Sequence, residues 1–176
     1  MSQQAGRYQR SAGGLAGAMI VLAALLVTWV ALRSLTSPDP DTAVRTVDYT
    51  QAVPPAKKAA DFDLVAPARL PTGWRATSVG FTDSDPQHWH LGVLTDENRY
   101  VGLEQGADTE RSMVRTYVDE QPSRGKPVGV AGQRWTTYTD AGGDLALVRT
   151  AGGATTLVVG HDVPRATLVS YVASLE

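Results

Sequence analysis

An uninterrupted apolar segment near the N-terminus constrains the fold of this chain more than any other feature. From Ala12 to Leu32 the sequence contains no charged residue, and Arg10 and Arg33 flank the segment. About 20 helical residues are needed to cross the roughly 30 Å hydrocarbon core of a bilayer. We therefore expect a transmembrane signal-anchor helix over residues 12–33, which contacts the lipid bilayer through residues 12–32.

The flanking basic residues predict the orientation of this helix. Arg7 and Arg10 lie on its short N-terminal side, so the positive-inside rule places residues 1–11 in the cytoplasm. A cleaved signal peptide is the alternative, but such peptides have an apolar region of about 7–15 residues that ends at small side chains. Here the segment is longer and ends in the bulky sequence Trp29-Val30-Ala31-Leu32. We expect a retained helix in the cell membrane and an extracytoplasmic C-terminal domain.

Charge and cysteine content restrict what the outer part can do. All 18 acidic residues lie from Asp39 onward, together with 13 of the basic ones, which gives this part a net charge of −5. An acidic domain is a poor partner for nucleic acid, which selects clustered Lys and Arg. The chain has no cysteine, which excludes disulfides and thiolate metal sites.

The pattern of apolar residues and turn signals predicts an α+β domain over residues 61–176. Residues 34–60 are expected to form a linker with a possible first strand from Val44 to Tyr49. Asp108-Thr109 and Asp162 are predicted helix caps, and Pro164 is expected in the first turn of the last helix. The predicted strands are 75–81, 89–95, 99–105, 127–138, 145–149 and 155–159.

Short glycine-rich connections between these strands favour an antiparallel sheet, because parallel neighbours require much longer crossovers. The two predicted helices each carry one apolar stripe. We therefore expect an antiparallel β-sheet with two α-helices on one face, preceded by the transmembrane helix.

The order of several short motifs resembles the DUF4245 family of actinobacterial single-pass membrane proteins of unknown function. The resemblance covers nearly the whole chain, and it implies a membrane setting without implying an activity or any functional residue. It is carried by these segments, in this order: Val47-Asp48-Tyr49, Leu70-Pro71-x-Gly73-Trp74-Arg75-Ala76-Thr77-Ser78, Trp89-His90-Leu91-Gly92, Tyr100-Val101-Gly102-Leu103-Glu104-Gln105, Gly132-x-x-Trp135, Val158-Val159-Gly160 and Ser174-Leu175.

Two histidines are the strongest indication of chemistry. His88 and His90 are two residues apart in a predicted strand, so they lie on the same face and could share a divalent metal. His161 is the candidate third ligand, with Asp162, Asp83 or Asp85 as alternatives. The competing interpretation is that the pair belongs to the polar outer face of a half-exposed strand.

Other candidate residues also allow two interpretations. Trp74, Trp89 and Trp135 could line a groove for an apolar ligand, or they could fill the core, as large aromatic residues of a small domain commonly do. Glu104 could act as a general acid or base if a second carboxylate lay across the sheet, or it could lie on the outer face with Tyr100 and Gly102.

These observations favour a non-enzymatic binding or interaction module of the cell envelope, with an envelope protein or ligand as partner and no cofactor. Two alternatives stay open. One is a lipid- or small-ligand-binding protein that uses the tryptophans, and the other is a metal-dependent enzyme that uses His88, His90 and His161.

Overall fold

The computed structural model describes residues 45–176. Within this range no helix is long and apolar enough to span a membrane. The predicted transmembrane helix, the cytoplasmic N-terminus and the first part of the linker lie outside the described residues.

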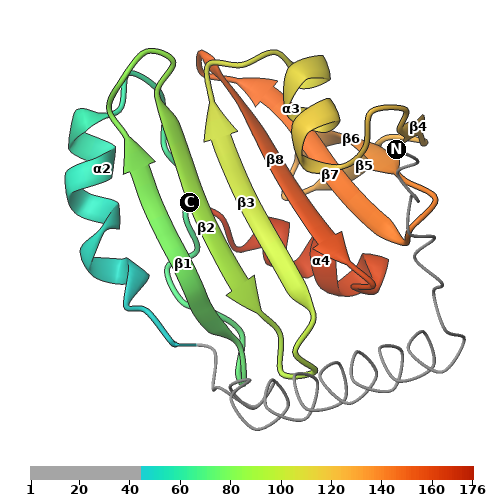
Figure 1. Ribbon diagram of the computed structural model, residues 1–176, viewed down its shortest axis with the longest axis horizontal. Helices are drawn as coiled ribbons and strands as arrows, with labels where there is room; N and C mark the ends of the chain where they lie inside the picture. The colour runs from blue at the N-terminus through green and yellow to red at the C-terminus, as the bar shows by residue number, and fades with distance from the viewer. Residues whose placement is uncertain (1–44) are drawn as a thin grey trace, which may run out of the picture. The chain divides into compact units, whose positions relative to one another are not determined.

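The described chain is built around an eight-stranded sheet in which every paired neighbour is antiparallel (Figure 1). The order across the sheet is β1-β2-β3-β8-β7-β6-β4, and β5 also pairs with β6. The strands are β1 (Arg75–Thr82), β2 (His88–Leu94), β3 (Tyr100–Gly106), β4 (Ser123–Arg124), β5 (Val128–Val130), β6 (Gln133–Thr139), β7 (Asp144–Ala151) and β8 (Ala154–His161). The prediction of an antiparallel sheet within an α+β fold is therefore confirmed.

Helices cover both faces of the sheet, which corrects the prediction that they share one face. Helix α4 (Arg165–Ala173) packs with Leu147 and Val158 in the larger core cluster. Helix α3 (Glu110–Tyr117) packs with Val148 and Leu157 in a second cluster. These are neighbouring residues of β7 and β8, and successive side chains of a strand point to opposite faces. Figure 1 shows α3 in front of β8 and β7 and α4 behind the sheet.

Residues 45–60 belong to the folded unit, which begins at Arg45. This segment forms a 3-10 helix, η1 (Tyr49–Gln51), and helix α2 (Val53–Ala59), where a linker or a first strand was expected. The amide of Val47 donates to the carbonyl of Ala76 in β1 at 2.9 Å. In Figure 1, α2 runs beside β1, so the segment lies along one edge of the sheet.

Two further elements differ from the prediction. The expected single strand over 127–138 is a hairpin of β5 and β6, because Ala131 and Gly132 both adopt positive φ and reverse the chain. Asp162 also has positive φ and caps no helix, and Pro164 occupies the N-cap of α4. The prediction for α3 is confirmed: the Thr109 hydroxyl accepts from the amide of Ser112.

Candidate functional site

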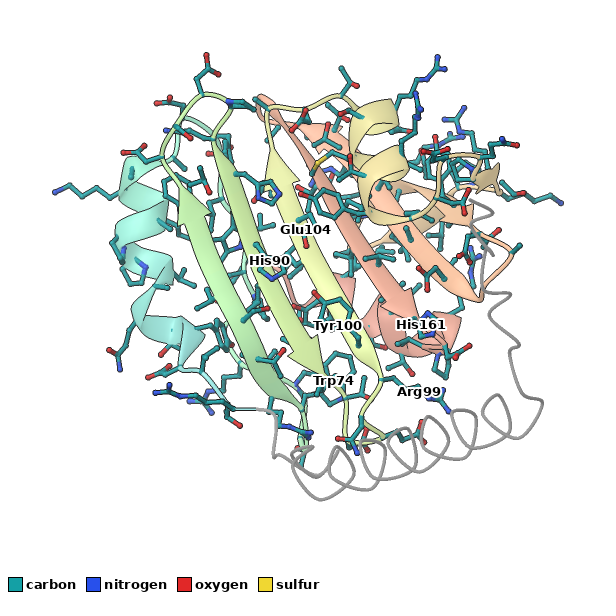
Figure 2. The ribbon with its side chains drawn as sticks, in the orientation of Figure 1. Trp74, His90, Arg99, Tyr100, Glu104 and His161 are labelled. Atoms are coloured by element: carbon teal, nitrogen blue, oxygen red, sulfur yellow. The ribbon has the colours of Figure 1, made fainter. Side chains whose placement is uncertain are left out.

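Strands β1, β2 and β3 present a polar face on the same side of the sheet as α3, which we call the histidine face. Its central residues are Ser78, His88, His90, Tyr100 and Glu104. Register places them together, because His90 of β2 is directly opposite Glu104 of β3. Figure 2 shows His90, Glu104 and Tyr100 close together on the two strands. The prediction that His88 and His90 share one face is confirmed.

The carboxylate of Glu104 lies between the two histidines and is almost completely buried. His90 Nδ1 is 2.7 Å from Glu104 Oε1, and His88 Nε2 is 3.2 Å from Oε2. Only 4% of the Glu104 side chain is exposed, although it belongs to the polar face. The Oε2 atom makes no hydrogen bond of good geometry within the described residues, and the 3.2 Å contact with His88 is the closest that it has to an ion pair. The histidines, rather than solvent, compensate the buried carboxylate.

These contacts shift the proton affinities of the pair in opposite directions. Burial alone would raise the pKa of Glu104, but the contacts with His88 and His90 outweigh it and lower that pKa. The hydrogen bond to Glu104 raises the pKa of His90, against a smaller opposing effect of burial. An ionised Glu104 beside a readily protonated His90 is therefore the favoured state of the pair.

A β-bulge in β1 brings a serine to this pair. Ala76 is opposite Val93, but Ser78 is opposite Gly92, so Thr77 is an extra residue without a partner of its own. In a regular register Ser78 would face the core opposite Leu91. The bulge instead turns Ser78 to the histidine face, where its Oγ lies 2.8 Å from His90 Nε2.

Two tyrosines border the histidine face. Tyr117 of α3 stacks on the ring of His88 at 5.8 Å between centroids, and its hydroxyl lies 3.1 Å from His88 Nε2. Tyr100 extends over Gly92 and Gly102: a Cβ added at Gly92 would lie 2.9 Å from its hydroxyl oxygen. The two glycines leave the space that the Tyr100 ring occupies.

The structure does not bring His161 to the other histidines. Leu157 of β8 is aligned with Glu104 and hence with His90, and His161 lies four residues further along β8. Four residues of a strand span about 13 Å. Two nitrogen ligands of one zinc ion lie within about 4 Å of each other, since each bond is near 2 Å. His161 instead contacts Asp144 at 2.6 Å, and residues 45–176 contain no group of three His, Cys, Asp or Glu side chains that could hold a metal.

Two of the three tryptophans lie in the core, and the third packs against it. Trp89 is completely buried and Trp135 is 4% exposed, so neither offers surface to a ligand. Trp74 is half-buried and stacks on Tyr171 of α4, with ring centroids 5.4 Å apart. Trp89 and Trp135 are therefore core residues, and Trp74 packs against the core with part of its surface exposed.

An open cleft of about 630 Å³ lies between α3 and the edge strand β4, and we call it the arginine cleft. Pro122 and Tyr138 provide apolar surface inside it, above the buried Val114. The Tyr138 hydroxyl donates to Glu110 at 2.6 Å, and burial together with this contact raises the pKa of Tyr138. The cleft is lined by Glu110, Arg111, Val114, Arg115, Glu120, Gln121, Pro122, Arg124 and Tyr138.

Comparison with known protein families identifies the lineage. The family model described as "Protein of unknown function (DUF4245)" matches residues 7–175, nearly the entire chain. The chain belongs to the DUF4245 family. No curated protein matches it at a significant level.

Sequence reasoning found part of the DUF4245 histidine face and missed the rest. The pair His88 and His90 was found because residues two apart in a strand share a face. Ser78 was missed because strict alternation places it on the same face as Ala76, which is the core face. No sequence signal marked the bulge. The arginine cleft could have been suspected from Arg111 and Arg115, which are four residues apart in a predicted helix and thus adjacent on its surface.

Proposed function

We propose that this DUF4245 protein is a membrane-anchored, extracytoplasmic binding module, and that the arginine cleft binds a carboxylate-rich segment of an envelope partner. One observation carries the proposal: three arginines line an open 630 Å³ cleft whose inner surface is partly apolar, in a chain whose outer part is acidic.

The arrangement of charge and apolar surface in the cleft suits an extended acidic ligand. Arg111 and Arg115 are exposed neighbours on α3, and Arg124 lies on the exposed edge strand β4. A guanidinium binds a carboxylate with two parallel hydrogen bonds, which gives both attraction and orientation. Apolar groups of the ligand would pack on Pro122 and Tyr138 while its carboxylates contact the arginines.

Glu110 and Glu120 also line the cleft and weaken its attraction for a carboxylate, but Glu110 already contacts other residues. Glu110 accepts from Tyr138 and lies 3.8 Å from Arg124. Within residues 45–176, Arg111 and Arg115 have no such ion-pair partner, so both guanidinium groups are available to a ligand. We therefore assign the binding energy mainly to this pair.

A titration with a defined probe tests the cleft. Fluorescein-labelled hexaglutamate is added to the full chain in detergent, and fluorescence anisotropy gives the Kd. We expect saturable binding that weakens with salt, because exposed charges are screened. The variant Arg111→Glu/Arg115→Glu should raise the Kd at least tenfold, about 1.4 kcal/mol.

The control is Arg134→Glu, which changes another exposed arginine, in β6 and outside the cleft. It should change the Kd by less than about twofold, since distant exposed charges interact weakly. No saturable binding, or equal losses in the two variants, would reject the cleft as the binding site.

The proposed location rests on the apolar segment 12–32 and on Arg7 and Arg10. Because the chain has no cysteine, Ser123→Cys introduces a unique thiol at an exposed position of β4. We expect a membrane-impermeant maleimide to label this thiol on intact cells. Labelling that requires cell lysis would reverse the proposed orientation.

A further inference from the structure

Ser78, His90 and Glu104 form a continuous chain of short contacts that the binding proposal does not use. Ser78 Oγ lies 2.8 Å from His90 Nε2, and His90 Nδ1 lies 2.7 Å from Glu104 Oε1. The connectivity is that of the Ser-His-acid triad, in which the acid contacts one ring nitrogen and the nucleophile contacts the other. We propose that Ser78 is a nucleophile for carboxylic esters, with His90 as its general base and Glu104 as the positioning residue.

The carboxylate determines how His90 can act. Glu104 is buried and accepts a hydrogen bond from Nδ1, so the neutral ring carries its hydrogen on Nδ1. The other nitrogen, Nε2, is then an acceptor and points at the Ser78 hydroxyl. The Ser78 proton thus has a base within reach, which is the first geometric requirement for an activated serine.

The surface around Ser78 leaves room for a substrate. Gly80 is the residue of β1 directly opposite His90, and a Cβ added there would meet no atom within 4 Å. A Cβ at Gly92 would lie 2.4 Å from Ser78 Oγ and 2.9 Å from the Tyr100 hydroxyl. The two hydroxyl groups therefore flank one point above Gly92, so Tyr100 can donate a hydrogen bond to an oxyanion that forms beside Ser78.

The reaction balances without a cofactor. The Ser78 oxygen attacks the ester carbonyl carbon as its proton passes to His90 Nε2, and the carbonyl oxygen becomes an oxyanion. The carbon–oxygen bond to the alcohol then breaks, and His90 returns the proton to the departing alcohol. Water hydrolyses the acyl-serine by the same route, which releases the carboxylic acid and regenerates Ser78.

A fluorophosphonate tests for the activated serine, because attack of Ser78 on phosphorus forms a phosphorus–oxygen bond and displaces fluoride. The full chain in detergent is incubated with a fluorophosphonate reporter, and the modified peptide is identified by mass spectrometry. We expect modification of Ser78, at a rate at least tenfold above that of heat-denatured protein. Ser78→Ala should abolish the modification.

Ser112→Ala is the matched control, since the Ser112 hydroxyl contacts Asp108 and no histidine. It should label like the unchanged protein. Circular dichroism verifies the fold of each variant. Absence of labelling on the folded chain, or labelling that persists in Ser78→Ala, would overturn the proposal.

The pH dependence of labelling separates an activated serine from a structural hydroxyl. His90 is faced by Glu104 and Tyr100 of β3, with His88 of β2 and Tyr117 of α3 around the same carboxylate. Labelling should increase with pH through a midpoint above 6.5, because only neutral His90 accepts the proton and its pKa is raised. Glu104→Gln should slow labelling and move this midpoint downward. A labelling rate that does not change with pH in this range would contradict the role of His90 as a base. The hexaglutamate experiment tests the arginine cleft separately, so its result does not depend on this outcome.

Discussion

His90 and Glu104 form a hydrogen bond across the β2–β3 ladder, with 2.7 Å between Nδ1 and Oε1 and only 4% of the Glu104 side chain exposed, and the contact is an ion pair when His90 is protonated. The contact fixes the orientation of the His90 imidazole and favours the ionised form of Glu104. Glu104 is buried even though strand alternation places it on the polar face of the sheet. Because each partner shifts the pKa of the other, their contact makes the stability of the domain depend on pH.

The contribution of this pair to stability should be largest between about pH 4.5 and 6.5, the ordinary pKa values of the two groups. The pKa of Glu104 is lowered on folding, so its contribution is lost as the pH falls through the folded value. The pKa of His90 is raised, so its contribution is lost as the pH rises through the folded value. Urea unfolding should show Glu104→Gln destabilised by about 1–2 kcal/mol near pH 5.5 and by less at pH 9. An equal loss at both pH values would contradict the ion pair.

Gly80 and Gly92, two of the glycines on the histidine face, should respond differently to a methyl group. Gly92→Ala would place its Cβ 2.4 Å from Ser78 Oγ, so it should lower the free energy of unfolding by about 1–3 kcal/mol. Gly80→Ala, on the neighbouring strand, meets open space and should change it by less than about 0.5 kcal/mol. Chemical denaturation of both variants provides the measurement. Equal changes in the free energy of unfolding for the two variants would show that the Ser78 and Tyr100 hydroxyls do not occupy the space over Gly92.

Trp89 should behave as a core residue rather than as a ligand contact. It is completely buried in the larger cluster, and its Nε1 has no hydrogen-bond partner. Trp89→Ala should therefore lower the free energy of unfolding by about 3–5 kcal/mol. Trp74→Ala should have a smaller effect, since Trp74 is only half-buried. Thermal unfolding followed by circular dichroism ranks the two variants, and the reverse ranking would contradict the packing described.

The sheet was predictable because its signals are local. Alternating apolar residues, short polar turns and the Thr109 cap each act over a few residues, and they define β1, β2, β3 and α3. The faces that the helices cover depend on contacts between distant segments. One sequence signal was nevertheless present: β8 contains the unbroken apolar run Leu157-Val158-Val159, which is typical of a strand covered on both sides.

The candidate sites were less predictable for a related reason. The pair His88 and His90 follows from strand periodicity, but the position of Ser78 depends on the single-residue bulge at Thr77. A shift of one residue reverses the face of every following side chain, and only the paired strand reveals it. His161 was the candidate third ligand because sequence spacing contains no information about the offset of β8 against β2.

Residue-resolved NMR of the full chain in detergent micelles tests the binding proposal most directly. Hexaglutamate is titrated into labelled protein, and the backbone and arginine side-chain shifts are followed. We predict saturable shift changes at Arg111, Arg115, Arg124 and Tyr138, with no change at His90 and its neighbours on the histidine face. Shift changes centred on the histidine face, or none that saturate, would contradict the account.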